Sequence, residues 1–191
     1  MTPFKKRRRG GLVATFDPAE AAVIANLAGQ VVELLRDRTG TGVAESDPLI
    51  GELGLGGPTQ PPDDPVLQRL LPDAYRENAD DSAEFRRFTE SSLTSAKVQN
   101  AEAMIASLVS GGFDPTDPGE NDVEVELDPD AVQAWLKSLT DIRLSLGVRL
   151  GIETEEDAML LDKSADPAAV AMGELYDWLG YVQETLVQAL A

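Results

Sequence analysis

One local pattern occurs twice in this chain: a short run of strand-forming residues, then Asp-Pro, then a long amphipathic segment. Residues 12–16 precede Asp17-Pro18, and residues 123–127, which alternate valine or leucine with glutamate, precede Asp128-Pro129. A lone strand of this length is not stable in water, so we expect the two strands to pair with each other beneath the helices. The sequence therefore predicts a mainly α fold with a small two- or three-stranded sheet, arranged as a helical bundle-like single domain.

Apolar residues recur at helical spacing after each predicted cap, and aspartate before proline is a strong helix start. The predicted helices cover residues 17–38, 65–71, 81–110, 128–150, 154–161 and 166–190. The third helix would be about 43 Å long at about 1.5 Å per residue. A helix of that length either spans the whole domain or enters a homodimer interface. Its predicted buried stripe consists of Phe85, Phe88, Val98, Ala101, Ile105, Leu108 and Val109.

Two segments differ in composition from this helical body. Residues 39–64 contain six glycines and four prolines, which predicts a long flexible loop. Residues 1–10 are interpreted as a basic N-terminal tail, followed by a single helical domain over residues 11–191. No apolar run approaches the roughly 18 residues that a transmembrane helix needs, so we expect no contact with membranes and a cytoplasmic protein.

The chain is strongly acidic, with 16 Lys and Arg against 34 Asp and Glu and a net charge of −18. Such a body repels nucleic acids and anionic membranes and attracts basic protein surfaces. Five cations stand together near the start, and their removal leaves 11 cations against the 34 acids. The basic run either binds DNA phosphates or is a disordered segment or one folded back on the acidic body. The five residues are Lys5, Lys6, Arg7, Arg8 and Arg9.

The chain contains neither cysteine nor histidine. This excludes disulfides, thiolate catalysis and cysteine-ligated zinc, and it removes the commonest general base and metal ligand. The acidic segment 113–122 lacks the spacing of an EF-hand, and no glycine-rich phosphate loop follows a strand. We therefore expect no catalytic residues, no metal and no cofactor. An enzyme that works with carboxylates alone stays a third alternative, behind two binding functions.

Two arginines are candidate partner-binding residues. Arg143 and Arg149 are two of only four cations between residues 112 and 191, and both lie on a predicted apolar helix. A structural role would pair Arg143 with the neighbourhood of Asp141 or with the last helix, for example with Glu174 or Asp177, while its side chain covers the core. A functional role would have both arginines bind an acidic patch on a partner.

Aromatic residues make up only 5% of the chain, so each large one is informative. We interpret Trp135 and Trp178 as core anchors, and Tyr176 and Tyr181 as candidate partner-binding residues. Gly147 lies inside a predicted helix, where glycine is about 1 kcal/mol less favourable than alanine. Close packing against the helix that carries Trp178 would explain its presence.

Several of these stretches together resemble a known family. They are the basic start, the first strand with its Asp-Pro helix, the stretch Asp141-Ile-Arg-Leu-x-Leu-Gly-x-Arg-Leu-Gly-Ile152, and the C-terminal residues 176–190. The chain is similar to the actinobacterial family, formerly a domain of unknown function, that is associated with the actinomycete oxidative-stress regulator AosR.

The resemblance implies a cytoplasmic, transcription-associated regulator that acts by protein–protein contact, with a sigma factor or RNA polymerase as partner, and not by enzymatic chemistry. Redox sensing in such a regulator would need a cysteine pair. Because this chain has no thiol, we expect no thiol redox switch within it. The alternative is a DNA-binding regulator that uses the basic N-terminal tail.

Overall fold

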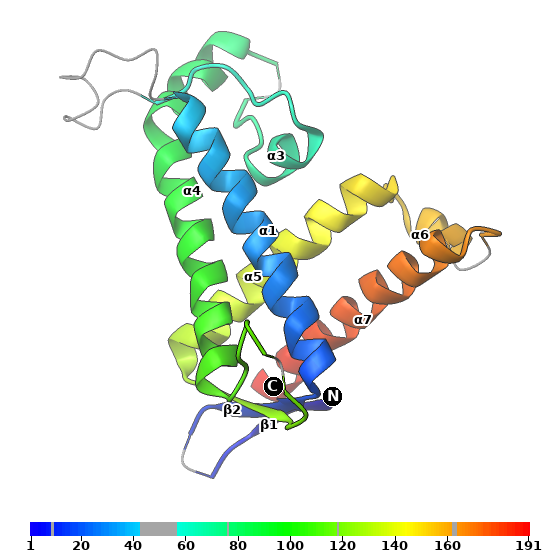
Figure 1. Cartoon of the computed structure of the whole chain (residues 1–191). Helices are drawn as coiled ribbons and strands as arrows, with labels where there is room; N and C mark the ends of the chain where they lie inside the picture. The colour runs from blue at the N-terminus through cyan, green and yellow to red at the C-terminus, as the bar shows by residue number, and fades with distance from the viewer. Residues whose placement is uncertain (9, 43–56, 76, 118, 162–163) are drawn as a thin grey trace.

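The computed structural model describes residues 1–8, 10–42, 57–75, 77–117, 119–161 and 164–191 (Figure 1). Two strands come before the first helix, and the third strand lies between two later helices. This mainly helical structure with a small sheet confirms the predicted fold class. In chain order the elements are β1 (Thr2–Lys6), β2 (Leu12–Phe16), α1 (Pro18–Gly42), α3 (Pro65–Leu70), α4 (Ala79–Ser110), β3 (Val123–Leu127), α5 (Pro129–Leu150), α6 (Glu155–Leu161) and α7 (Pro167–Leu190).

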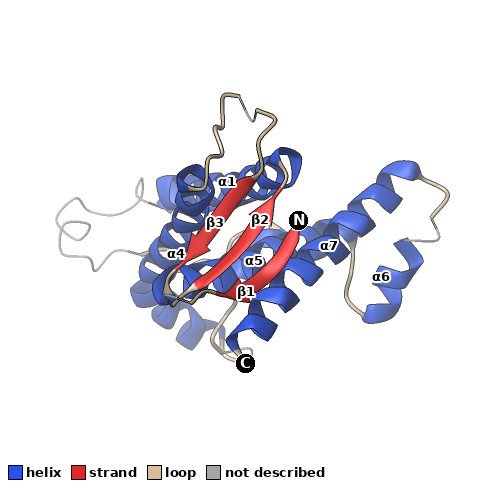
Figure 2. Cartoon of the chain, turned by 90° about the horizontal axis from the view of Figure 1, so that it is seen from below, coloured by secondary structure: helices blue, strands red, loops and turns tan. Residues whose placement is uncertain are grey.

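The sheet is antiparallel with β2 in the middle, in the order β1-β2-β3. Leu12 pairs with Leu127 and Phe16 with Val123, so the two segments of the repeated pattern are hydrogen-bonded neighbours, as predicted. Figure 2 shows the three strands side by side with the helices behind them. Alternate residues of β3 are buried, while Glu124 and Glu126 lie on the exposed face.

The first strand corrects the interpretation of residues 1–10 as a tail, because residues 2–6 form β1 instead. The reason is Phe4, which is 5% exposed and reaches the core. Its ring lies edge-on to Phe16 at 6.0 Å and to Trp135 at 5.6 Å between centroids. One aromatic residue in an otherwise polar strand is therefore enough to dock the strand on the helices.

The helices divide into two groups (Figure 1). Helices α1 and α4 lie side by side, and α5 packs against α4 and α7. Helices α5 and α7 pack against each other and extend away from the sheet, and α6 lies near their far ends. Trp135 of α5 is fully buried, as expected for a core anchor, whereas Trp178 of α7 is half-buried. None of the helices in the described ranges is long and apolar enough to cross a lipid bilayer.

Local capping determines most helix starts. Asp128 and Asp166 accept hydrogen bonds from backbone N–H groups of the first turns of α5 and α7, each beside a proline, as predicted. Helix α4 instead begins earlier than expected, because the Asn78 side chain caps it. Helix α1 continues past Arg38 to Gly42. Most of the predicted loop 39–64, including its apolar stretch 49–55, lies outside the described residues.

The buried stripe of α4 differs from the prediction in its first half and at Val109 near its end. Ala101 and Leu108 are buried as expected, but Phe85, Phe88 and Val109 are exposed. The inward positions of the first half are polar or charged, because this half packs against charged side chains rather than apolar ones. The buried residues of α4 are Ser82, Arg86, Glu90, Thr94, Ala101, Met104 and Leu108.

Candidate protein-binding surfaces

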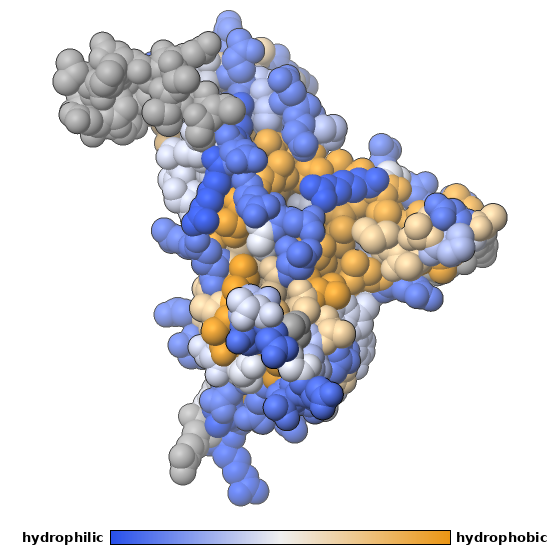
Figure 3. Space-filling model, viewed as in Figure 1, coloured by the Kyte–Doolittle hydropathy of each residue, from blue (hydrophilic) through white to orange (hydrophobic). Residues whose placement is uncertain are grey.

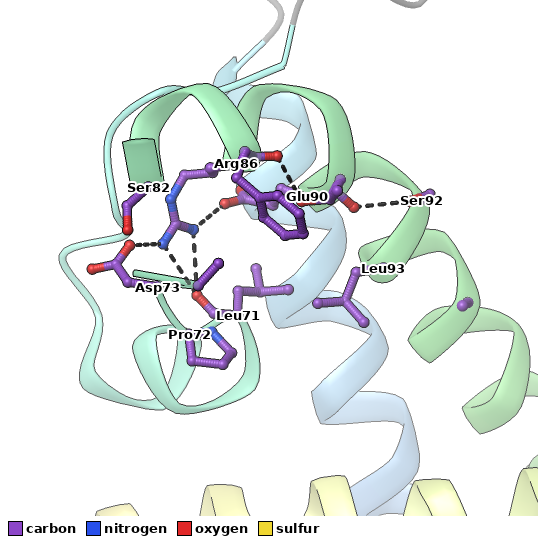
Figure 4. A pocket seen from close by; sticks show the side chains of 12 residues that line it. Leu71, Pro72, Asp73, Ser82, Arg86, Glu90, Ser92 and Leu93 are labelled. Carbon is purple, nitrogen blue, oxygen red and sulfur yellow. Dashed lines mark hydrogen bonds and ion pairs between the residues drawn. The ribbon is translucent and has the colours of Figure 1, made fainter. Parts of the chain in front are cut away.

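An ion-pair network fixes the orientation of the first half of α4 (Figure 4). The Arg86 guanidinium donates hydrogen bonds to Leu71 O at 3.3 Å and to Asp73 Oδ1 at 2.5 Å, and it pairs with Glu90 one turn on. The Glu90 carboxylate also accepts from Arg38 Nε of α1 at 2.9 Å. The network therefore joins α1, α4 and the segment that follows α3.

Both central members of this network are deeply buried, with side chains 5% and 4% exposed for Arg86 and Glu90. Burial alone would lower the pKa of Arg86, but its hydrogen bonds to Asp73 and Glu90 more than offset this effect and raise the pKa. Arg86 therefore stays charged. The charged side chains of α4 point inward, where they pair with each other and with Asp73. The aromatic side chains on the opposite side of the helix therefore face the solvent.

The outward side of α4 carries an exposed apolar surface, here called the α4 surface and made up of Tyr75, Phe85, Phe88 and Leu93. These side chains are 41–53% exposed, and the Tyr75 and Phe85 rings lie edge to face at 6.0 Å. A hollow of about 550 Å³ is lined by two of them, Phe85 and Leu93, together with Pro72 (Figure 4).

The sequence contained a signal for this surface that periodicity reasoning missed. Residues seven apart lie on nearly the same side of a helix. Counting back from Leu108 in steps of seven gives Ala101 and then Thr94, and all three are buried. Phe85 and Phe88 are out of phase with that series, so they belong to a different side of the helix. Phase along the whole helix, and not local apolar content, would have placed them outside.

A second hollow, here called the α5–α7 cleft, is lined by these two helices and by the segment that joins α5 to α6, and has a volume of about 960 Å³. Leu144, Gly147 and Val148 of α5 line one side, and Tyr176 of α7 lines the other. Figure 3 shows hydrophobic surface over α5 and α7 in the same region of the molecule. A methyl group on Gly147 would lie 3.8 Å from Tyr176 of α7, an ordinary contact distance, so α7 lies beside this glycine but its packing does not require a glycine there.

Arg143 lines this cleft and contacts the last helix, as the structural role predicted, but through other residues than the two named examples. Its guanidinium lies over the Tyr176 ring at 5.0 Å from the centroid, and its Nη1 donates to Gln183 Oε1 at 3.0 Å. A Cβ atom at Gly180 would lie 3.4 Å from Nη2 of the same guanidinium, so the arginine packs directly on this glycine. The expected pairing with Glu174 or Asp177 is replaced by this stacked arrangement.

The other two predicted partner-binding residues lie elsewhere. Arg149 is on the side of α5 that faces α1, where its Nη1 donates to Gln30 Oε1 at 3.3 Å. Tyr181 is 48% exposed on α7 and does not line the cleft. The structure thus brings Arg143 and Tyr176 together and separates them from Arg149 and Tyr181.

The basic run near the N-terminus lies on the β1–β2 hairpin. Lys5 and Lys6 are exposed residues of β1, and Arg7 pairs with Glu126 of β3. Arg8 is exposed, and Arg9 lies outside the described residues. This basic hairpin, defined as residues 5–8, is therefore held against an acidic strand.

No cluster of three or more potential ligands that could hold a metal ion occurs among the residues that the structure describes. The acidic segment after α4 instead makes local turns, in which Asp114 accepts from the Thr116 hydroxyl and backbone. These hydrogen bonds lower the pKa of Asp114.

Together these features define an acidic, mainly helical single-domain protein whose surface hollows are lined by both apolar and charged side chains. A family model described as "Domain of unknown function (DUF2017)" matches residues 1–190, so the chain belongs to that family.

Proteins described as "Oxidative stress regulator AosR" from Mycobacterium bovis and Mycobacterium tuberculosis are 32% identical over 187 residues, which covers 91% of this chain and 79% of theirs. A related protein from Mycobacterium leprae is 29% identical over 186 residues, again covering 91% of this chain and 79% of its own length. No solved structure matches the chain.

Proposed function

We propose that this chain is a regulatory protein that acts by binding another protein through the α4 surface, without enzymatic chemistry. The relatives described as oxidative stress regulators support the regulatory role. The family resemblance implies a sigma factor or RNA polymerase as the partner. Because this chain has no cysteine, the contact would not depend on a thiol switch of its own.

The proposal rests mainly on the first half of α4, in which charged side chains are buried and aromatic side chains are exposed. Arg86 and Glu90 are buried there, while Phe85, Phe88 and Leu93 are 46%, 53% and 41% exposed on the same helix. Contiguous exposed apolar side chains mark interaction surfaces in soluble proteins, and aromatic residues are enriched at the centres of interfaces. A covered position for these rings would remove the cost of their exposure to water.

The shape of the surface favours an amphipathic helix as the bound element. The hollow beside Phe85 continues past Leu93 into a second one of about 440 Å³ between α4 and α5, lined in part by Lys97 and Lys137. Such a groove takes an apolar stripe of helical spacing. Lys97 is paired with Asp141, whereas Lys137 is exposed with no ion-pair partner among the described residues. An acidic residue on the partner helix would therefore meet Lys137.

The test is binding of the purified chain to purified sigma factors and core RNA polymerase of its source organism, measured by biolayer interferometry. We expect one of them to bind wild type, and the double variant Phe85→Ser/Phe88→Ser to bind at least tenfold more weakly. Val109→Ser is the matched control, because Val109 is an equally exposed apolar residue near the other end of α4. Circular dichroism checks that both variants fold.

Two outcomes would contradict the proposal. Equal binding by the double variant and the control would remove the α4 surface as the contact. Absence of binding to any sigma factor or polymerase would remove the partner that the resemblance implies.

DNA binding by the basic hairpin is the second candidate function. Lys5, Lys6 and Arg8 are exposed and favour it, but Arg7 is neutralised by Glu126 and the body of the protein is acidic. DNA binding through these residues would weaken steeply with added salt. A salt-dependent shift of duplex DNA that the triple variant Lys5→Ala/Lys6→Ala/Arg8→Ala abolishes would support this function over the contact proposal.

A further inference from the structure

We propose that the α5–α7 cleft binds a small amphipathic anion, with the anionic group on Arg143 and the apolar body against Leu144, Val148 and Tyr176. None of the four residues of the α4 surface lines this cleft, although the cleft shares Thr140 and Gln183 with the second hollow of the proposed partner groove. The ligand proposal does not depend on the proposed protein contact. Its ligand class follows from the size of the cleft, the state of Arg143 and the distribution of charge around it.

The size of the cleft suits a small organic molecule. Its volume of about 960 Å³ lies at the upper end of the roughly 300–1,000 Å³ typical of small-molecule sites. Leu144, Val148 and Ile152 supply apolar walls, and Gly147 leaves the floor without a side chain. Ligand sites combine such walls with a few fixed polar groups, and the cleft has one in Arg143.

Arg143 is held in place by its contacts, but only part of its hydrogen-bonding capacity is taken up. It stacks on Tyr176 and donates from Nη1 to Gln183, and among the described residues it has no carboxylate partner. Its Nε is buried without a hydrogen-bond acceptor. A guanidinium has five N–H donors. The buried Nε is out of reach of a ligand and Nη1 already donates to Gln183, so the donors that remain for an anion are those of Nη2 and the second N–H of Nη1. Because stacking already restricts the side chain, an incoming carboxylate or sulfonate would lose little of its binding energy to ordering the arginine.

The charge distribution favours an anion here over other parts of the protein. Arg69 of α3 also lines the cleft, and the two arginines face the exposed acids Glu153 and Asp177. The cleft is therefore close to neutral in a chain with a net charge of −18. In the cleft an anion therefore meets less electrostatic repulsion than it would elsewhere on the surface. Glu153 and Asp177 are exposed, so water screens their charges.

The probe for the experiment is 8-anilinonaphthalene-1-sulfonate, which joins an anionic group to an apolar body and fluoresces when it leaves water. N-phenyl-1-naphthylamine has the same rings without the sulfonate and serves as the neutral comparison. Both are titrated into the full chain that carries Phe85→Ser and Phe88→Ser, so that the α4 surface does not compete for the dye. We expect the sulfonate to bind at least tenfold more tightly than the neutral probe.

Charge removal locates the site. Arg143→Gln should weaken sulfonate binding at least tenfold and leave the neutral probe within twofold. Arg149→Gln is the matched control, because it removes the same charge from the far side of α5 and should change neither affinity. If Arg143→Gln fails to fold by circular dichroism, Arg69→Gln replaces it, since Arg69 is exposed and should lower sulfonate affinity about threefold through its charge alone.

Three results would overturn the proposal: equal affinity of the two probes for the starting protein, equal loss with Arg143→Gln and Arg149→Gln, or no loss with Arg143→Gln or its replacement.

Discussion

The Glu90 carboxylate should be one of the most sensitive positions in this protein, because it bridges two arginines from different elements. It accepts from Arg38 Nε of α1 at 2.9 Å and pairs with Arg86 of its own helix, and its side chain is 4% exposed. Glu90→Gln keeps the shape and removes the charge, which leaves two cations facing each other with Asp73 as the remaining carboxylate. Breaking a buried ion pair by removing one partner costs about 3–5 kcal/mol.

We place the expected loss near the lower limit, at about 3 kcal/mol, because Arg38 is 16% exposed and keeps a second hydrogen bond to Gln60 O. Glu102→Gln is the matched control: the same substitution on the same helix, also facing an arginine of α1, but with Arg36 and Glu102 62% and 47% exposed. Exposed pairs contribute about 0–1 kcal/mol.

The assay is equilibrium unfolding in urea followed by circular dichroism. With m values of about 1–3 kcal/mol/M, a loss of about 3 kcal/mol lowers the midpoint by about 1–3 M. Added salt should shrink the Glu102 effect and leave the Glu90 effect nearly unchanged, because screening acts mainly on exposed charges. If the two variants differ by less than about 1 kcal/mol, the buried network does not hold α1, α4 and the segment after α3 together as argued.

Three further predictions concern stability. Burial raises the pKa of Asp141, partly offset by its hydrogen bond and charge attraction to Lys97, so the folded state holds this proton to higher pH than the unfolded state. The stability that this proton confers is fully present below the ordinary aspartate pKa of about 3.9 and is lost as pH rises through the higher folded value; Asp141→Asn should remove that dependence in a pH series of urea midpoints, and an unchanged pH profile would contradict this. Gly29→Ala should raise the free energy of unfolding by about 0.5–1 kcal/mol, because a methyl group there meets nothing within 4 Å and alanine is the better helix former. Gly11→Ala should lower it by more than about 2 kcal/mol, because φ is +78° and the methyl carbon would lie 2.5 Å from Leu127 O; thermal melts that rank these two glycine variants in the opposite order would contradict both.

Part of the α5–α7 cleft could be predicted from the sequence. Two cations in a very acidic half of the chain indicated Arg143 and Arg149, and scarce aromatics indicated Tyr176 and Tyr181. Sequence spacing could not tell which of these four residues share a surface. Arg143 and Arg149 point to different sides of α5, and only the side that carries Arg143 contacts α7. The stacking of Arg143 on Tyr176 depends on the angle between the two helices, which spacing within either helix does not contain.

The sequence by itself determined the elements whose signals are local. Asp-Pro caps and apolar periodicity specified the starts of α5 and α7, and alternation specified β3, because these signals act within a few residues of the backbone they order. Instability of lone strands specified that β2 and β3 pair.

Only the tertiary structure decided which distant residues cover each buried side. Phe4 became part of a strand because Phe16 and Trp135 offered an aromatic partner from distant parts of the chain. The first half of α4 turned its phenylalanines outward because Arg38 and Asp73 met Arg86 and Glu90 on its other side. Burial of a helix side depends on what packs against it, and those partners lie up to 52 residues away in sequence.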